Sequence, residues 1–368
     1  MKVPFIDLYA QYQTIRSEVD AAIADTIQHS AFIKSAAVGT FEEEFANYLG
    51  ASHVVSCGNG TDALEILLRV LGVGAGDEVI VPALSWISTS EVVATAGAKP
   101  VFVDIDPDSY ALDVSQVEAK ITDRTRAIIP VHLYGHPADM PALMEIANRH
   151  DLKVIEDCAQ AHGANIQGQK IGTWGHAAAF SFFPTKNLGA FGDAGAMVIR
   201  DEEQARQARM IAHHGQANRH RHQVHGRNSR MDGLQAAVLS VKLPHLERWT
   251  EQRISHAARY SQQLADVAEV TLPLVPDELR HVFHLYVIRT PQRDALKQYL
   301  AERQISTMIH YPLALPFQPC YASLGHQPAD FPVVSQYQEE ILSLPMYPEM
   351  TDEALDYVVQ TIQNFSNA

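Results

Sequence analysis

The stretch HVVSCGNGTDALEILLRVLG (53–72) contains a short apolar run, a turn with two glycines and an amphipathic segment of helix length. It predicts a buried strand, a tight turn at Gly58 and Gly60, and a helix that opens at Thr61. Similar apolar runs follow at 77–84, 99–106, 126–135, 152–160, 177–183 and 195–200, with helix-like segments between them such as 88–97 and 141–150. Near-continuously apolar strands that alternate with helices are typical of a mostly parallel sheet sandwiched by helices, so we expect an α/β fold.

The two ends of the chain have different patterns. Residues 4–50 read as helical, with Gly50 placed to cap the last turn. The strand–helix alternation fades after about residue 240, where we expect one long helix at 240–264, followed by short strands such as 281–290. The sequence therefore predicts a large domain at 1–240, with an N-terminal helical segment, and a smaller C-terminal α/β domain at 241–368.

Composition excludes several classes of function. The 368 residues include 28 Lys and Arg against 43 Asp and Glu, a formal net charge of −15 that gives no general attraction to nucleic acid or to an anionic membrane. No signal-peptide pattern opens the chain and no apolar run reaches the length of a membrane span, so we expect a cytoplasmic protein. Cys57, Cys158 and Cys320 have no metal-type spacing and form no even disulfide set, and we expect no metal site.

Ligands of open α/β sheets bind beyond the carboxyl ends of the strands, so residues at those ends are the first candidates for a site. The turn SCGNGTDAL (56–64) is one such end. Its glycines allow close backbone approach, and free N–H groups at the start of a helix form an anion site. An ordinary strand-to-helix turn with an N-cap explains the same residues equally well.

Asp157 and Lys186 occupy two further strand ends. Asp157 directly follows a buried-strand pattern, where a carboxylate needs a cationic or donor partner; a structural salt bridge is the alternative. Lys186 lies in SFFPTKNLG (181–189), and a desolvated lysine loses proton affinity and becomes an amine nucleophile for Schiff-base chemistry. Taken alone, such a lysine is more often a surface residue whose stem packs on apolar neighbours.

Together these strand ends describe one site. Trp86, in PALSWIST, is either a core residue or an aromatic plane for a ligand, and Ser181 adds a hydroxyl to the anion site. The site then offers an anion cradle, an aromatic plane, a carboxylate for a ring nitrogen and a lysine for an aldehyde. These are the requirements of pyridoxal phosphate, which proteins bind through a lysine Schiff base and an Asp on the pyridinium nitrogen.

Five motifs in order also carry a family resemblance: GNGTDAL, EDCAQAHGA, SFFPTKNLG, GRNSRMDGLQAAVL (226–239) and IHYPLAL (309–315). The chain resembles the DegT/DnrJ/EryC1/StrS family of pyridoxal-phosphate aminotransferases, which act on nucleotide-linked keto sugars. The likeness extends from FIDL near the start to LSLPMYP (342–348). It implies a fold type I aminotransferase that works as a homodimer with active sites at the subunit interface, with pyridoxamine phosphate as the intermediate form of the cofactor.

The resemblance also implies residue roles. Lys186 would bond to the cofactor and later shuttle the proton, and Asp157 would pair with the pyridinium nitrogen. Arg230, His310 and Tyr311 would line the substrate side. The other cofactor contacts that it implies are Gly60, Thr61, Trp86, Gln160, Ser181 and Asn228 of the partner subunit.

Two features bear on the reaction. Family members that dehydrate sugars carry histidine in place of the cofactor-linked lysine, so Lys186 favours transamination. After His310 the chain lacks a histidine that relatives commonly carry near Phe317, which leaves the finer substrate contacts open. A pyridoxal-phosphate sugar dehydrase and a non-catalytic regulator are the alternatives from other classes.

The segment HHGQANRHRHQVHGRNSRM (213–231) holds four arginines, five histidines and no acid. Arginine forks fit phosphate oxygens, so the segment suits a diphosphate; a solvated loop with largely neutral histidines is the alternative. With the ending SLPMYP, it resembles the branch that aminates 3-keto UDP-hexuronates, such as UDP-2-acetamido-2-deoxy-3-oxo-glucuronate, with L-glutamate as donor in surface-polysaccharide and O-antigen synthesis. The alternative substrate is a UDP- or dTDP-linked 4-keto-6-deoxy sugar.

Overall fold

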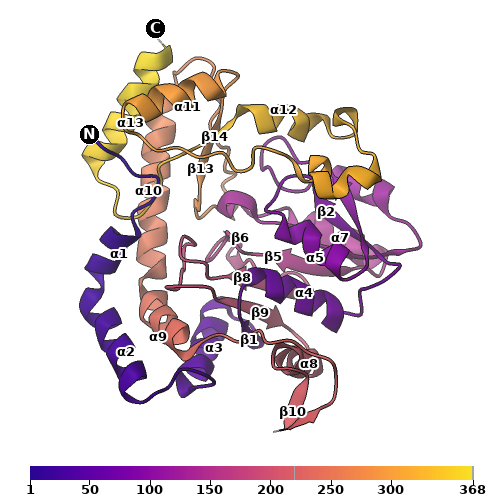
Figure 1. Ribbon diagram of the computed structural model, residues 1–368. Helices are drawn as coiled ribbons and strands as arrows, with labels where there is room; N and C mark the ends of the chain where they lie inside the picture. The colour runs from indigo at the N-terminus through magenta and orange to yellow at the C-terminus, as the bar shows by residue number, and fades with distance from the viewer. Residues whose placement is uncertain (219, 367–368) are drawn as a thin grey trace.

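The computed structural model describes residues 1–218 and 220–366 (Figure 1). Its centre is a seven-stranded sheet in the order β1-β9-β8-β5-β4-β2-β3, in which only β9 runs antiparallel to its neighbours. The predicted mostly parallel sheet is therefore confirmed. The strands are β1 (His53–Cys57), β2 (Glu78–Pro82), β3 (Lys99–Val103), β4 (Thr125–Ile128), β5 (Lys153–Asp157), β8 (Ala177–Ser181) and β9 (Gly195–Ile199).

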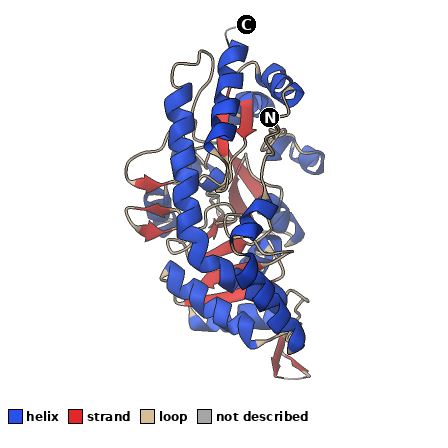
Figure 2. Ribbon diagram, turned by 90° about the vertical axis from the view of Figure 1, so that its left-hand side faces the viewer, coloured by secondary structure: helices blue, strands red, loops and turns tan. Residues whose placement is uncertain are grey.

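Helices cover both faces of this sheet (Figure 2). Because successive strand side chains point to opposite faces, Val54 and Val55 of β1 belong to two different apolar clusters. One cluster contains the buried side of α4, and the other contains α3 with Phe41 and Phe45. The helices of this part are α1 (Leu8–Thr14), α2 (Arg16–Gln28), α3 (Ala36–Leu49), α4 (Gly60–Val70), α5 (Ser88–Thr95), α6 (Val114–Val117), α7 (Met140–Arg149) and α8 (Glu202–Ala212).

Gly50 ends α3 as predicted. It adopts the left-handed conformation (φ 73°) and its N–H returns to the carbonyls of Ala46 and Asn47. After α8 the chain forms a small hairpin of β10 (Gln216–Asn218) and β11 (Arg221–His222), which projects at the lower end of Figure 1. A separate small sheet contains β6 (Asn165–Ile166), β7 (Gln169–Lys170) and β12 (Leu279–Arg280).

The prediction of one long helix at 240–264 is wrong. Helix α9 (Gly233–Lys242) ends at a 3₁₀ turn, Leu243–His245, and α10 (Leu246–Leu264) follows it. Pro244 lies at the start of that turn, where its missing N–H breaks the helical hydrogen-bond ladder. Helix α10 then runs upward along the side of the molecule, as Figures 1 and 2 show.

The C-terminal part has its own apolar core. The antiparallel strands β13 (Tyr286–Arg289) and β14 (Ile341–Leu344) pack with α10 and with α11 (Arg293–Glu302), α12 (Pro332–Glu340) and α13 (Asp352–Ser366). Val3, from the other end of the chain, is fully buried in the same core. The division at residue 240 stays a prediction. Among the described helices, none has the length and hydropathy of a membrane span.

Helix α3 is anchored on the sheet through aromatic rings, and this gives a test of the fold. The ring of Phe45 is fully buried, with its centroid 5.1 Å from that of Phe180 and 5.3 Å from that of Phe182. We expect Phe45→Ala to lower the free energy of unfolding by about 3–5 kcal/mol, because it removes a large core ring and leaves a cavity. Urea denaturation at fixed protein concentration measures it, with exposed Leu274→Ala as the control. Equal stability of the two variants would contradict this packing.

Candidate active site

Asp157 ends β5 in the middle of the sheet and is buried. Its Oδ2 accepts a hydrogen bond from Thr89 Oγ1 (2.9 Å), and its Oδ1 accepts one from the backbone N–H of Ala159 (3.2 Å). Burial raises the pKa of the Asp157 carboxyl, while these donors and the charge of Lys186 oppose the rise. A cation placed against this carboxylate would therefore be bound strongly, as a protonated ring nitrogen requires.

Lys186 follows β8 in a turn in which its backbone N–H donates to the carbonyl of Phe183 (2.8 Å). Burial of the amine lowers the pKa of Lys186 to about 8, and the charge of Asp157 acts in the opposite direction. The residue as a whole is half-buried. Because an ordinary lysine has a pKa of about 10.4, Lys186 has far more of the neutral, nucleophilic amine at neutral pH.

The predicted cradle would lie at the start of α4. Asn59 caps the helix by accepting from the N–H of Asp62 (2.8 Å), and no acceptor for the N–H groups of Gly60 and Thr61 lies within the described residues. A Cβ on Gly60 would lie 2.8 Å from the Cβ of Ser181, so glycine is needed for the helix to approach the end of β8. The structure thus brings Gly60, Thr61 and Ser181 to one place, with free N–H groups suited to a phosphate.

Two hydroxyl residues of this region were not singled out from the sequence. Ser88 Oγ lies 2.7 Å from Thr61 Oγ1, and Thr89 both contacts Asp157 and lies 2.8 Å from Ser85 Oγ. Both residues belong to the first turn of α5, directly after Trp86. The Ser-Thr-Ser run at 88–90 was the available signal, but only the pairing of distant strands shows that it faces Asp157.

Gln160, which follows Asp157 closely in the chain, forms a connected group with Tyr311 and Trp86. Gln160 Oε1 accepts from the N–H of Tyr134 (2.7 Å), and its Nε2 donates to the hydroxyl of Tyr311 (3.1 Å). The ring centroids of Trp86 and Tyr311 are 5.8 Å apart. Trp86 is 58% exposed, so the core alternative for this residue is wrong and its ring face is open to a ligand.

His310 lies close to the lysine. Its Nδ1 is 2.8 Å from Ser343 Oγ, and its carbonyl accepts from the hydroxyl of Tyr134. Burial, with a contribution from the charge of Lys186, lowers the pKa of His310 to about 4, so the ring is neutral at physiological pH. His284, whose Nδ1 lies 3.2 Å from Asn187 Oδ1, loses proton affinity for the same reasons. Burial thus lowers the pKa of Lys186, His310 and His284 alike.

Asn228 and Arg230 are placed apart from this group. They lie at the base of the β10–β11 hairpin, where Arg230 Nη1 is 3.3 Å from His213 Nδ1 and the exposed Asn228 pairs with His213 through the backbone. Within the described residues, no hydrogen bond or ion pair joins either residue to Lys186 or Asp157. A role at the partner subunit's site, as the resemblance implies for Asn228, agrees with this placement but is not tested by a single chain.

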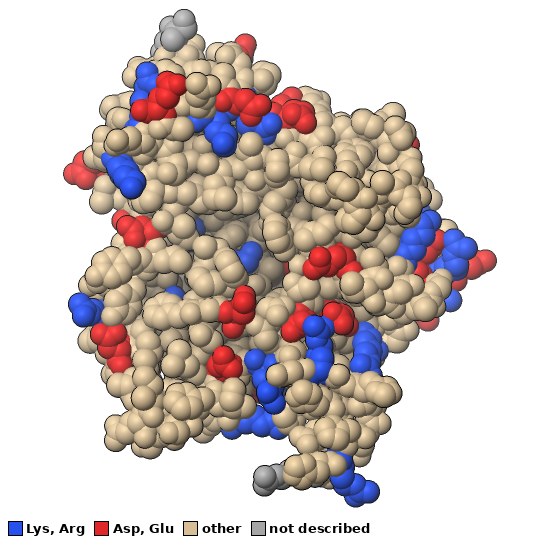
Figure 3. All heavy atoms as spheres, viewed as in Figure 1, with Lys and Arg blue, Asp and Glu red and all other residues tan. Residues whose placement is uncertain are grey.

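The basic segment 213–231 is only partly free for a ligand. Arg227 forms ion pairs with Asp62 (2.7 Å) and Glu65 (2.5 Å) of α4, so its charge is already compensated. Arg219, which the prediction also counted, lies outside the described residues. Lys and Arg side chains gather at the lower end of the face shown in Figure 3, around α8 and the hairpin.

One buried cluster has the composition of a metal site. The ligand atoms of His132, Glu156 and Cys158 all lie within 4.8 Å of one another. Glu156, however, accepts hydrogen bonds from His132 and from the backbone N–H groups of Gly172, Trp174 and Gly175. His132 Nδ1 accepts from the N–H of Ala138 (3.0 Å). These contacts account for the cluster as a network that holds the turn before β8.

Comparisons with known proteins agree with this geometry. The model of the DegT/DnrJ/EryC1/StrS aminotransferase family matches residues 13–363. The chain belongs to this family. It is 49% identical to a Geobacillus stearothermophilus protein named "pleiotropic regulatory protein", over 99% of both chains. It is 43% identical to a UDP-N-acetyl-3-dehydro-alpha-D-glucosamine 3-aminotransferase of Acidithiobacillus ferrooxidans (98% of this chain, 97% of the relative). It is 40% identical to the UDP-2-acetamido-2-deoxy-3-oxo-D-glucuronate aminotransferase of Pseudomonas aeruginosa (98% and 100%).

Solved structures give the same result. The Streptomyces venezuelae protein DesV, in complex with a ketimine intermediate, superposes with a TM-score of 0.97 at 42% identity, over 100% of this chain and 99% of that one. NtdA from Bacillus subtilis, with bound cofactor PMP, gives a TM-score of 0.93 at 31% identity over 100% and 86%. The predicted fold class and cofactor are confirmed: this enzyme is an aminotransferase that depends on pyridoxal phosphate.

The residues of the chain fit this cofactor. At the start of α4, where a Cβ on Gly60 would crowd Ser181, the free N–H groups would hold the phosphate. Asp157 would hold the ring nitrogen, and the exposed Trp86 would lie against the ring. When bound, pyridoxal phosphate supplies an electron sink that lets a proton leave the substrate α-carbon. Lys186 would bind the aldehyde carbon. Once released, its neutral amine would take and return that proton, because its pKa of about 8 lies close to physiological pH.

The lowered pKa of Lys186 predicts how cofactor loading depends on pH. Only the neutral amine attacks the aldehyde, so the loading rate should rise about tenfold per pH unit below pH 8 and level off above it. We expect this profile when pyridoxal phosphate is mixed with apoenzyme and the visible absorption band is followed. Nα-acetyl-lysine is the control, and its rate should keep rising to about pH 10. The same continued rise in the protein would show that Lys186 is an ordinary lysine.

Thr89 provides a second test. Thr89→Val keeps the shape of the side chain but removes the hydrogen bond to Asp157 Oδ2. The carboxylate loses about 1–3 kcal/mol of stabilisation, so we expect cofactor affinity to fall roughly 5- to 100-fold. Equilibrium titration of apoenzyme with pyridoxal phosphate measures this, and Thr95→Val, which changes an α5 threonine bonded only to the carbonyl of Val92, is the matched control. Unchanged affinity in Thr89→Val would mean that this bond does not support the site.

Proposed function

We propose that this enzyme transfers the amino group of L-glutamate to the 3-keto position of a UDP-linked hexuronate, such as UDP-2-acetamido-2-deoxy-3-oxo-glucuronate. The observation that carries the reaction type is the desolvated amine of Lys186, which has a pKa of about 8 and interacts with the charge of Asp157. A relative that only dehydrates would not need this lysine. The position on the sugar is supported by the two transaminases described above, since both are named for a keto group at carbon 3.

The contacts of Arg230 support a hexuronate as the substrate. Among the described residues Arg230 has no acidic partner; its guanidinium contacts His213 instead. A partly buried guanidinium that has no carboxylate partner in the protein can bind the carboxylate of a substrate. A 4-keto-6-deoxy sugar, the alternative, brings no carboxylate to this position.

A homodimer with shared active sites forms part of the proposal. Phe183 and Phe191, on either side of Lys186 in the chain, are 48% and 41% exposed, and Phe32 and Ile33 are also exposed. Large apolar side chains that remain open in one chain favour burial against another. We place the enzyme in the cytoplasm, where nucleotide-linked sugars for surface polysaccharides and O-antigen would be its substrates.

The proposal is tested by release of 2-oxoglutarate. Holoenzyme with L-glutamate and the 3-keto UDP-hexuronate should form equal amounts of 2-oxoglutarate and of an amino sugar, identified by mass. We expect Lys186→Ala to lower turnover by at least about 10³-fold, because it removes the proton shuttle, while Lys120→Ala, at an exposed lysine, should leave it unchanged.

Each contrary result indicates a different function. Loss of water from the sugar in place of amination would indicate a dehydrase. Tight binding of the sugar nucleotide with no 2-oxoglutarate would favour a non-catalytic regulator; the Geobacillus relative is named a regulatory protein. If the enzyme aminates only a 4-keto-6-deoxy sugar, the proposed reaction is right and the proposed substrate is wrong.

A further inference from the structure

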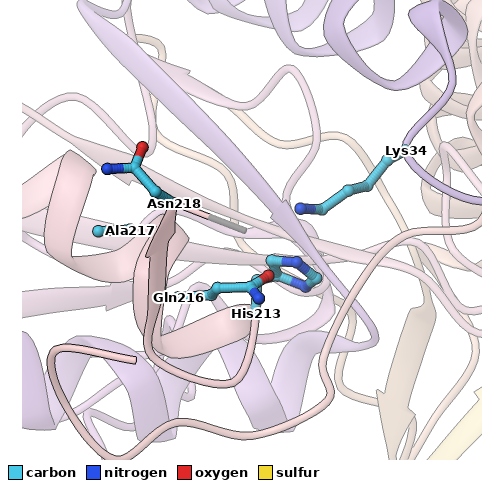
Figure 4. A pocket seen from close by; sticks show the side chains of 5 residues that line it. All are labelled: Lys34, His213, Gln216, Ala217 and Asn218. Carbon is cyan, nitrogen blue, oxygen red and sulfur yellow. The ribbon is translucent and has the colours of Figure 1, made fainter. Parts of the chain in front are cut away.

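A cavity whose lining includes none of the residues assigned to the cofactor lies at the base of the β10–β11 hairpin. It has a volume of about 350 Å³ and is lined by Lys34, His213, Gln216, Ala217 and Asn218 (Figure 4). Ligand cavities in proteins typically start at about 300 Å³, so this one is large enough for a small polar group. Neither the sequence motifs nor the cofactor geometry assigns a role to Lys34.

Two distant segments are fixed together to build one wall of this cavity. Ile33 pairs with Asp232 in an antiparallel bridge, and the N–H of Gly233 donates to the carbonyl of Phe32 (2.7 Å). A Cβ on Gly233 would lie 2.0 Å from the carbonyl oxygen of Ala31, so only glycine allows this approach. Lys34 itself has φ 53°, an uncommon conformation for a residue with a side chain. The backbone therefore holds Lys34 in a defined place beside the hairpin.

Backbone contacts also fix the base of the hairpin. The N–H of His214 donates to the carbonyl of Arg227 (2.8 Å), and His213 pairs with Asn228. A Cβ on Gly215 would lie 1.6 Å from the carbonyl oxygen of Val224, so the two sides of the loop touch through their backbones. The side chain of His213 is thereby directed to the cavity, with Arg230 at 3.3 Å on its Nδ1.

The cavity is positively charged. In Figure 4 the amine of Lys34 extends toward the ring of His213 and the side chain of Gln216. Burial and the charges of Lys34 and Arg230 all lower the pKa of His213, which places both cations near this ring. No acidic residue lines the cavity. A pocket with a cation, amide N–H donors and an imidazole, and without an acid, is suited to a phosphate oxygen.

We propose that this cavity is an anion subsite that binds the phosphate groups of the nucleotide-linked substrate, with Lys34 as its principal cation. This inference rests on the proposed function and extends it to residues outside the family motifs. The subsite adjoins Asn228, which the resemblance assigns to the partner subunit's cofactor. The nucleotide would then lie across the subunit boundary, with its phosphates held by the hairpin of one chain.

Variants of Lys34 test the subsite. A charge-assisted hydrogen bond to phosphate contributes about 1.5–3 kcal/mol, so Lys34→Ala should raise KM for the sugar nucleotide roughly 10- to 100-fold, with kcat nearly unchanged. Lys34→Glu should raise it further, and Lys34→Arg should restore most of the affinity. Lys297→Ala is the matched control, because Lys297 lines another surface cavity, of about 430 Å³. The rate at which L-glutamate alone converts the bound cofactor should be the same in all variants.

The results separate this inference from the proposed function. If all variants turn over the keto sugar with wild-type KM, the subsite is wrong and the proposed function stands. If wild-type enzyme aminates no keto sugar, calorimetric titration with UDP decides: binding to wild type that is lost in Lys34→Glu supports the anion subsite. Equal binding to both, or binding to neither, overturns it.

Discussion

The buried carboxylate of Asp157 is the constraint on which the rest of the site depends. It ends β5, the middle strand of the sheet, so it can reach water only at the carboxyl edge where its neighbours also end. An ionised carboxylate at such a place is costly unless donors and a cation surround it. Thr89 of α5, the N–H of Ala159 and Lys186 beyond β8 supply them from three different elements. The parallel order of β8, β5, β4 and β2 is what brings these strand ends together.

Burial acts on this pair of groups in opposite directions. It raises the pKa of Asp157 and lowers the pKa of Lys186, and each group moderates the shift of the other. If Asp157 and Lys186 were both neutral, no negative charge would remain to bind a ring nitrogen. If both were fully charged, Lys186 would have no neutral amine to act as a nucleophile. The amine of Lys186, with its pKa lowered to about 8, thus lies near a carboxyl group whose negative charge opposes that lowering. Burial at one edge of the sheet is thus the main cause of the pKa shifts of both Asp157 and Lys186.

The sequence predicted what short patterns encode and missed what tertiary contacts create. Strand ends such as Asp157 and Lys186 follow visible apolar runs, and Gly50 and Gly60 occupy turns whose geometry requires glycine. The Ser-Thr-Ser run marks Thr89 only as a hydroxyl residue, and the contacts of Thr89 and Asn187 could not be read locally, because their partners lie 68 and 97 positions away in the chain. Pro244 itself signals the break between α9 and α10, but the helical periodicity on both sides led to the prediction of one continuous helix. Roles that depend on a second subunit, such as that of Asn228, cannot be decided from one chain.

The cofactor site and the hairpin are built independently but joined at one turn. The Oγ of Ser229 accepts from the N–H of Gly58 (3.0 Å), and Arg227 is ion-paired to Asp62, so the segment after the hairpin is fastened to the helix that forms the phosphate cradle. The cradle lies at the carboxyl edge of the sheet, whereas the strands β10 and β11 of the hairpin consist of half-buried and exposed residues at the surface. The chain superposes on DesV with a TM-score of 0.97, while relatives at 40–43% identity are named for different sugars, so similarity of fold does not decide the substrate. The contacts of Ser229 and Arg227 therefore fix the position of the hairpin base relative to the cradle.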